Sequence, residues 1–191
     1  MINNAIILHG GPSKKEYYDP EMPSMSNSHF IPWLQAQLLK NEITAHTPEV
    51  PHSFDRNWTV WQKEINRFEI NPNTLLVGHS TGAGFFVKYL SINKNLNVEK
   101  LMLVAPWIDP KHEKTKNFFD DFEIDSDLSK RVKDIVIFVS DNDEPSVLES
   151  VDIIKSKISI ARVISFPGYG HFCVEDMQST KFPELLEECL R

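Results

Sequence analysis

Residues 74–90 read Thr-Leu-Leu-Val-Gly-His-Ser-Thr-Gly-Ala-Gly-Phe-Phe-Val-Lys-Tyr-Leu. The apolar start is typical of a buried strand, and the apolar stretch after the glycines is long enough to begin a helix. Between them lies a Gly-x-Ser-x-Gly motif centred on Ser80. Glycines on both sides allow a sharp strand-to-helix turn, which exposes a serine hydroxyl at the N-terminus of the helix. The motif therefore predicts a nucleophile at Ser80, with a serine that merely caps the helix as the alternative.

Short apolar runs alternate with amphipathic stretches along the whole chain. We predict strands at residues 5–8, 43–47, 74–77, 101–104, 135–139 and 163–166. We predict helices at residues 29–39, 58–68, 82–92, 147–158 and 182–190. This alternation is typical of an α/β fold with a parallel sheet, and nearly all-apolar strands fit a sheet with helices on both faces. No repeat or linker interrupts the pattern, so we expect one domain over residues 1–191.

Four of the predicted strands end in motifs rich in glycine or polar residues. The motifs are His-Gly-Gly-Pro at 9–12, Gly-His-Ser-Thr-Gly at 78–82, Ser-Asp-Asn-Asp at 140–143 and Pro-Gly-Tyr-Gly-His at 167–171. Active sites of open parallel sheets gather beyond the carboxyl ends of the strands. We therefore expect these four motifs to meet at one edge of the sheet.

A serine hydroxyl needs a base to take its proton, and His171 is the best candidate among seven histidines. It stands in a glycine-rich turn after the last strand, although an ordinary surface histidine would also fit there. A carboxylate should accept the other imidazole N–H. Asp141, Asp143 and Glu144 all follow the preceding strand. We favour Asp143, which is placed to turn back under the imidazole, and Asp141 remains the alternative.

Backbone N–H groups are expected to stabilise the negative charge that develops during acyl transfer. One should belong to Thr81, directly after the nucleophile, and the other to the loop after the first strand. Gly11 is our choice in that loop, with Gly10 as the second choice, and a plain Gly-Pro turn is the alternative reading. The neighbouring His9 and His79 are expected to be structural.

The connection at 106–133 is rich in aromatic and acidic residues. Its aromatic residues are Trp107, Phe118, Phe119 and Phe122, and its acidic residues are Asp109, Glu113, Asp120, Asp121, Glu123, Asp125 and Asp127. One interpretation places Trp107, Phe118 and Phe119 beside Gly10 in a substrate pocket with an acidic rim. The alternative is a solvated loop whose aromatic residues pack on the sheet. A rim facing the site would disfavour anionic substrates and suit a neutral ester, or an amide with a free amine.

The motifs together resemble the small α/β-hydrolase family that includes retinoblastoma-binding protein nine and the bacterial YdeN-like hydrolases. The resemblance runs along the whole chain and includes Trp33, Trp58, Trp61 and the Leu-Val-Ala of 103–105. It implies a compact α/β-hydrolase fold of about six parallel strands in the order 2-1-3-4-5-6, without a large cap domain. It also implies that Asp143 is the acid of the triad. In this chain Glu144 stands where the family usually has proline directly after that aspartate.

Composition and charge narrow the class of protein further. The chain has 20 lysines and arginines against 27 acidic residues, a net charge of -7, so a basic nucleic-acid-binding face is not expected. Its two cysteines, Cys173 and Cys189, fit a reducing compartment. We see neither a secretory signal nor a membrane-spanning run, and we expect a cytoplasmic protein that does not bind membranes.

These features predict a serine hydrolase that cleaves a small carboxylic ester through an acyl-enzyme on Ser80, with an amide or a thioester as alternative substrates. We expect neither a metal nor an organic cofactor, because the chemistry requires none. The second hypothesis is a non-catalytic binding module that retains a hydrolase-like fold. Whether the chain has a protein partner is left open by the sequence.

Overall fold

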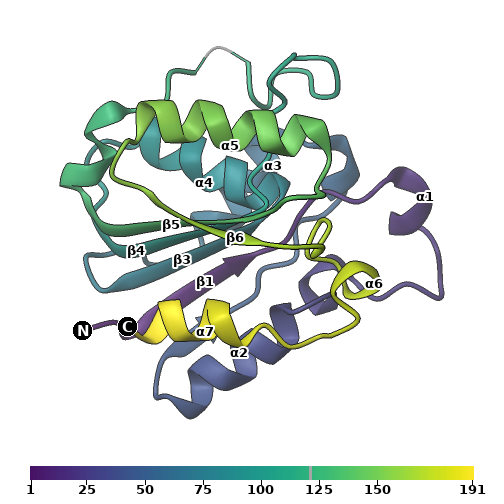
Figure 1. The fold of residues 1–191 in the computed structure, drawn as a ribbon, viewed down its shortest axis with the longest axis horizontal. Coiled ribbons are helices and arrows are strands. Elements are labelled where there is room, and N and C mark those ends of the chain that lie inside the picture. Colours follow the sequence, from purple (N-terminus) through teal and green to yellow (C-terminus); the bar gives the residue numbers. More distant parts are fainter. Residues whose placement is uncertain (121) are drawn as a thin grey trace.

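Six parallel strands form one open sheet in a computed structural model, which describes residues 1–120 and 122–191 (Figure 1). The strands are β1 (Asn4–Leu8), β2 (Thr44–His46), β3 (Thr74–His79), β4 (Val98–Val104), β5 (Val132–Ser140) and β6 (Arg162–Phe166). Their order is β2-β1-β3-β4-β5-β6, and every neighbouring pair is parallel. The predicted fold class and strand order are therefore confirmed.

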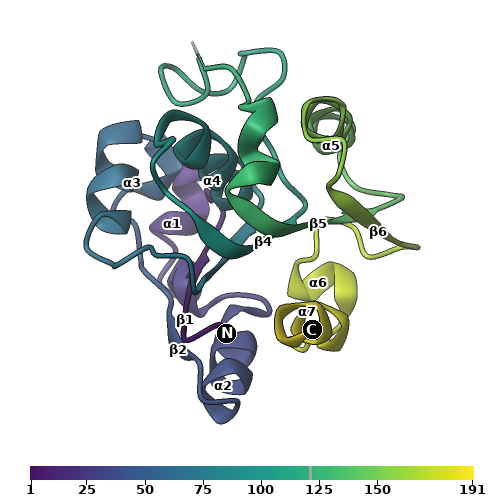
Figure 2. The same ribbon diagram turned by 90° about the vertical axis from the view of Figure 1, so that its left-hand side faces the viewer.

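Helices cover both faces of this sheet. The longer ones are α2 (Ile31–Lys40), α3 (Trp58–Ile65), α4 (Thr81–Ile92), α5 (Pro145–Lys157) and α7 (Pro183–Leu190). Figures 1 and 2 show α3, α4 and α5 on one face and α2 and α7 on the other. None of the helices within the described residues is long and apolar enough to cross a membrane.

Two neighbouring strands, β4 and β5, begin earlier than the apolar pattern predicts. β4 starts at Val98 and β5 at Val132, each three residues before the predicted start. Polar residues near these starts interrupt the apolar runs, but they have partners in the fold. Lys100 is buried because its ammonium donates to the carbonyls of Glu188 and Cys189 at the end of α7. A paired lysine can thus occupy a position that the pattern assigns to a loop.

Two short helices lie at the carboxyl end of the sheet, α1 (Lys14–Tyr17) and α6 (Val174–Met177) (Figure 1). Neither helix has a buried residue, so neither shows the apolar periodicity that would predict it. Three 3-10 turns were equally unexpected: Met25–Asn27, Ser53–Asp55 and Ser126–Lys130. The connections between the strands are therefore more structured than the sequence suggests.

The connection after β4 is tied to α4 by a buried lysine. The Lys88 ammonium donates to the carbonyls of Phe118 and Asp120 at 2.7 and 3.1 Å. It also lies 4.7 Å from the centre of the Trp58 ring, a distance typical of a cation–π contact. The connection thus packs on the helix that begins at the Ser-x-Gly turn. Asp121, one of its acidic residues, lies outside the described part of the chain.

Candidate active site

The turn at Ser80 is strained and tightly packed. Ser80 has a φ of 54°, in the region that favours glycine, and it connects β3 directly to α4. A Cβ atom at Gly82 would lie 2.3 Å from the carbonyl oxygen of His9, and one at Gly78 would lie 2.5 Å from the backbone of Ala83. Both glycines of the motif are therefore required by close backbone contacts, and the turn lies against the loop after β1.

Backbone hydrogen bonds hold the strained residue in place. The Ser80 N–H donates to the carbonyl of Val104 at the end of β4. The Ser80 carbonyl accepts from the N–H groups of Gly84 and Trp107 at 3.1 and 3.2 Å. Because two neighbouring segments share these bonds, the hydroxyl keeps a fixed position above the sheet.

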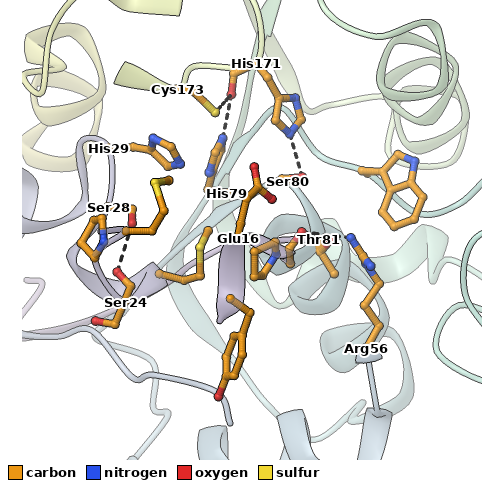
Figure 3. A pocket seen from close by; sticks show the side chains of 18 of the residues that line it. Glu16, Ser24, Ser28, His29, Arg56, His79, Ser80, Thr81, His171 and Cys173 are labelled. Carbon is orange, nitrogen blue, oxygen red and sulfur yellow. Dashed lines mark hydrogen bonds between the residues drawn. The ribbon is translucent and has the colours of Figure 1, made fainter. Parts of the chain in front are cut away.

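Three side chains from separate loops meet at this turn. His171 Nε2 lies 2.8 Å from Ser80 Oγ, and His171 Nδ1 lies 2.9 Å from Asp143 Oδ1. The Asp143 side chain is fully buried, and the same Oδ1 accepts from the N–H of Glu144. Figure 3 shows the imidazole directed at Ser80. The arrangement can carry a proton from the hydroxyl to an imidazole whose other nitrogen faces a carboxylate.

The turn that carries His171 is fixed by side chains that follow β5. Asp141 Oδ1 accepts from the N–H of Gly168 at 2.9 Å, and Asn142 Oδ1 accepts from the N–H of Gly170 at 2.8 Å. Ser140 Oγ accepts from Tyr169 N–H in the same turn. Asp141 therefore bonds to the turn and makes no hydrogen bond to the imidazole, whereas Asp143 does.

An aromatic residue anchors the other side of the same turn. Phe172, next to His171, is fully buried and stacks on Phe182 with ring centroids 5.4 Å apart. It also meets the edge of Phe166, at the end of β6. Asp176 of α6 accepts from the His171 N–H at 2.8 Å. Apolar burial and hydrogen bonds thus act together on the backbone that presents the imidazole.

His79 is buried beneath the site and supports it. Its Nε2 donates to the carbonyl of His171 at 2.8 Å, so the ring bears its proton there. Burial holds the pKa of His79 well below its usual value, and the neighbouring imidazoles of His171 and His29 lower it further. His79 is therefore neutral near neutral pH, in agreement with the structural role expected from the sequence.

The glycine loop after β1 lies next to Ser80 and is oriented by His9. A Cβ atom at Gly10 would lie 3.7 Å from Ser80 Oγ. His9 Nε2 accepts from the N–H of Val50 at 3.0 Å, so the proton of the neutral ring is on Nδ1, which donates to the carbonyl of Gly10 at 2.6 Å. In a trans peptide the next N–H points the opposite way. The Gly11 N–H therefore points away from the His9 ring.

A cavity of about 670 Å³ opens above these residues and is lined by Ser80, His171, Gly10, Gly11 and Thr81. Figure 3 shows His29 and Cys173 on one side of Ser80 and Arg56 on the other. The two sides therefore differ in chemistry, with an imidazole and a thiol facing a guanidinium.

Only part of the predicted pocket lines this cavity. Trp107 and Gly10 do, but Phe118 and Phe119 are fully buried in the core and do not. These two rings pack on each other and on α3 and α4, where apolar surface is shielded from water. The described acidic residues of 106–133 do not line the cavity either, whereas Lys114 does. The described acids of this connection therefore do not form the expected rim, and the carboxylates that line the cavity are those of Glu16, Glu49, Glu144 and Glu175.

Several lining residues were not predicted from the sequence, namely Met22, Met25, His29, Arg56 and Cys173. Cys173 stands two residues after His171, so its closeness in sequence to the predicted base could have indicated that it lines the site. Met22, Met25 and Arg56 come from loops and short turns without a recognisable motif, and His29 lies just before α2 although a helix was predicted from residue 29. His29 and Arg56 also have a positive φ, which no residue type at those positions would have suggested.

Among the described residues, His29, Cys173 and Glu175 are the group that could hold a metal, with potential ligand atoms within 4.8 Å of one another. The N–H of Val174 donates to His29 Nδ1, which leaves the imidazole proton on Nε2. Burial, together with the nearby carboxylate of Asp176, raises the pKa of the Cys173 thiol to about 12. Metals bind the thiolate and an unprotonated nitrogen, so the group is poorly prepared for a metal.

Comparison with known proteins identifies the family of this chain. A model of the Serine hydrolase family matches residues 22–188. The chain belongs to the serine hydrolase family. A search of the curated proteins found no match.

Solved structures share the fold of this serine hydrolase. The ydeN gene product of B. subtilis has a TM-score of 0.79 at 20% identity, covering 98% of this chain and 97% of that one. Est1E from Butyrivibrio proteoclasticus, solved with ferulic acid, has a TM-score of 0.68 at 15% identity, covering 98% and 88%. Carboxylesterase CesB from B. subtilis has a TM-score of 0.60 at 12% identity, covering 99% and 82%. The resemblance to YdeN-like hydrolases is thereby confirmed.

The close contact at Gly82 predicts a large effect of a single methyl group. Gly82→Ala should lower the free energy of unfolding by about 1–3 kcal/mol or more, because the Cβ atom would overlap the His9 carbonyl. Urea unfolding followed by circular dichroism measures this. Gly168→Asn is the matched control, since a Cβ atom there meets nothing within 4 Å and asparagine tolerates a positive φ. Equal unfolding midpoints for Gly82→Ala and wild type would contradict the packing argument.

The buried neutral histidines predict acid sensitivity of the fold. Burial lowers the pKa values of His9, His29 and His79, so unfolding takes up protons below about pH 6.5. The free energy of unfolding should fall between about pH 7 and pH 5, with His79 contributing at most about 1.4 kcal/mol per pH unit. Urea unfolding at both pH values should show a shallower dependence for His79→Gln. His52→Asn, at an exposed position, should keep the wild-type slope; equal slopes in all three proteins would refute the prediction.

Proposed function

We propose that this serine hydrolase cleaves a small carboxylic ester, with Ser80 as nucleophile, His171 as general base and Asp143 as the acid of the triad. The observation that supports the proposal is the continuous series of contacts from Ser80 Oγ through the His171 imidazole to Asp143, at 2.8 and 2.9 Å. Distances in this range are those that proton transfer requires.

In the first step, Ser80 Oγ attacks the carbonyl carbon of the substrate while its proton moves to His171 Nε2. The imidazole then carries a positive charge beside the buried carboxylate of Asp143, which stabilises it and keeps the ring in the correct tautomer. The strained turn supports this step, because it holds the hydroxyl exposed at the start of α4.

The carbonyl oxygen becomes negatively charged as the tetrahedral intermediate forms. We assign its stabilisation to the backbone N–H groups of Thr81 and Gly11. Thr81 directly follows the nucleophile, and the hydrogen bond from His9 to the Gly10 carbonyl orients the peptide that carries the Gly11 N–H. The hydrogen bonds are in place before substrate binds, so little reorganisation accompanies the reaction.

The intermediate collapses when His171 returns its proton to the leaving oxygen, which departs as an alcohol. The acyl group remains on Ser80 until water, deprotonated by the same imidazole, attacks it and restores the free serine. An amide or a thioester could follow the same route. Two structural neighbours, Est1E with ferulic acid and carboxylesterase CesB, support the choice of an ester. We propose further that residues 1–191 act as a single cytoplasmic domain, and the chemistry calls for no cofactor.

A fluorophosphonate probe tests the nucleophile. Wild type should become labelled at Ser80 near neutral pH, because the probe reacts with serines activated by a base. Ser80→Ala should remain unlabelled and inactive on p-nitrophenyl acetate, yet it should unfold at a similar urea concentration. In-gel fluorescence and peptide mass spectrometry measure the labelling. A well-folded wild type that neither reacts nor turns over the ester would favour a non-catalytic binding module.

The acid can be assigned by a pair of amide substitutions. Asp143→Asn should reduce kcat by roughly 10³- to 10⁴-fold, because an amide can stabilise the wrong imidazole tautomer and carries no charge. Asp141→Asn should stay close to the wild-type kcat, since its side-chain carbonyl can still accept from the N–H of Gly168. Steady-state hydrolysis of p-nitrophenyl acetate measures both. The reverse order of the two variants would make Asp141 the acid.

A further inference from the structure

A guanidinium that forms no ion pair with any described carboxylate lines one side of the active-site cavity. Arg56 donates from Nη1 to the carbonyl of Phe54 at 3.1 Å and from Nη2 to the carbonyl of Gly11 at 2.9 Å. The guanidinium carbon Cζ of Arg56 lies 5.4 Å from the centre of the Trp107 ring. Figure 3 shows the side chain reaching toward Thr81. The guanidinium is therefore held rigidly beside the proposed oxyanion loop.

The charge of Arg56 is not balanced by the described part of the protein. Burial lowers the pKa of Arg56, and Asp109 offsets this only partly, without forming an ion pair with it. The carboxylate of Asp109 already accepts hydrogen bonds from the backbone of Lys114 and Thr115 and from the Thr115 hydroxyl. The Nε–H of Arg56 is buried without a hydrogen-bond partner among the described residues. A partly buried cation in this state is costly, and an anionic ligand would remove much of the cost.

A second cation lies on the same wall of the cavity. The Lys114 ammonium is 5.8 Å from the centre of the Trp107 ring, and it faces Glu144 at 3.7 Å. Its side chain is largely exposed, so it adds a weaker and more mobile charge than Arg56. Four carboxylates also line the cavity, those of Glu16, Glu49, Glu144 and Glu175. Glu16 accepts from the N–H of Ser13 at the start of its own helix, Glu49 accepts from the N–H of Ser26, and Glu144 lies beside Lys114.

The guanidinium is separated from the nucleophile only by the two-glycine loop. A Cβ atom at Gly10 would lie 3.7 Å from Ser80 Oγ, and one at Gly11 would lie 3.2 Å from Arg56 Nη2. Consecutive Cα atoms are about 3.8 Å apart, so a carboxylate bound to Arg56 would be a few bonds from the scissile carbonyl. In the view of Figure 3, Ser80 lies between His171 and the guanidinium. The leaving oxygen must face His171, which places the anionic group on the acyl part of the substrate.

We propose that Arg56, with Trp107 and Lys114, forms an anion subsite that selects esters whose acyl group ends in a second carboxylate. The inference rests on the proposed esterase function and adds the substrate class to it. The described acidic residues of 106–133 do not line the cavity. The four glutamates that do line it form no ion pair with Arg56 in the described part of the chain, so the guanidinium remains available to an anion.

Two matched substrates test the subsite. The mono-p-nitrophenyl ester of adipic acid carries a terminal carboxylate, and the p-nitrophenyl ester of adipic acid monoamide has a neutral group of similar size. Release of p-nitrophenol, corrected for spontaneous hydrolysis, gives kcat/KM for each. Wild type should prefer the charged ester by about tenfold, and added NaCl should reduce this preference.

Variants separate recognition of charge from support of the Gly11 loop. Arg56→Gln should bring the charged-to-neutral ratio of kcat/KM close to one, and Arg56→Lys should retain part of the preference. Lys114→Gln should lower the ratio slightly. Lys111→Gln, an exposed lysine of the same connection that does not line the cavity, is the matched control and should keep the wild-type ratio.

Three results would overturn the proposal. A wild-type ratio of one or below would show that no anion subsite operates. An Arg56→Gln variant that loses activity equally on both esters would show that Arg56 only holds the Gly11 carbonyl. Failure to hydrolyse either ester, together with an absence of fluorophosphonate labelling, would overturn the esterase assignment itself and the subsite with it, and the labelling result distinguishes this case from the first two.

Discussion

The close backbone contact between the Ser80 turn and the loop after β1 is the constraint on which the functional end of the molecule depends. Gly82 lies so near the His9 carbonyl that no side chain fits between them. This contact brings together the turn that carries Ser80, the proposed nucleophile, and the glycine loop after β1. Because β1 and β3 are adjacent and parallel, their loops leave the sheet at the same edge. The strain at Ser80 is sustained by this packing and by the backbone bonds to β4 and its loop.

The imidazole is positioned by a different balance of forces. On one side, Ser140, Asp141 and Asn142 accept hydrogen bonds from the glycine-rich turn. On the other side, the neighbouring Phe172 is buried among the rings of Phe166 and Phe182. The polar contacts set the path of the turn, and the aromatic contacts prevent it from lifting off the sheet. The Asp143 side chain does not bond to the backbone of this turn, and its carboxylate faces the imidazole nitrogen Nδ1 of His171.

The sequence predicted the sheet well because buried parallel strands appear as apolar runs, and it placed the candidate residues where those runs end. From the sequence we favoured Asp143 over Asp141, because the turn was expected to bring Asp143 under the imidazole. The hydrogen bond between Asp143 and His171 agrees with that choice, and the catalytic role of Asp143 stays a prediction. Arg56 was missed because its position depends on a left-handed backbone in a long loop. Phe118 and Phe119 were misplaced because aromatic residues that line a cavity and those that fill a core look the same in a sequence. Only tertiary packing distinguishes them.

Cys173 gives the cavity an unusual chemoselectivity toward electrophiles. Its sulfur lies on the wall opposite Arg56, but burial and nearby carboxylates raise the pKa of the thiol to about 12. Alkylating reagents such as iodoacetamide attack thiolates, so they should be slow at this residue near neutral pH. A covalent inhibitor should therefore react with the Ser80 hydroxyl rather than with the Cys173 thiol. Toward such an inhibitor, Cys173 would act as a small apolar contact surface. Oxidative inactivation through this cysteine would be slow for the same reason.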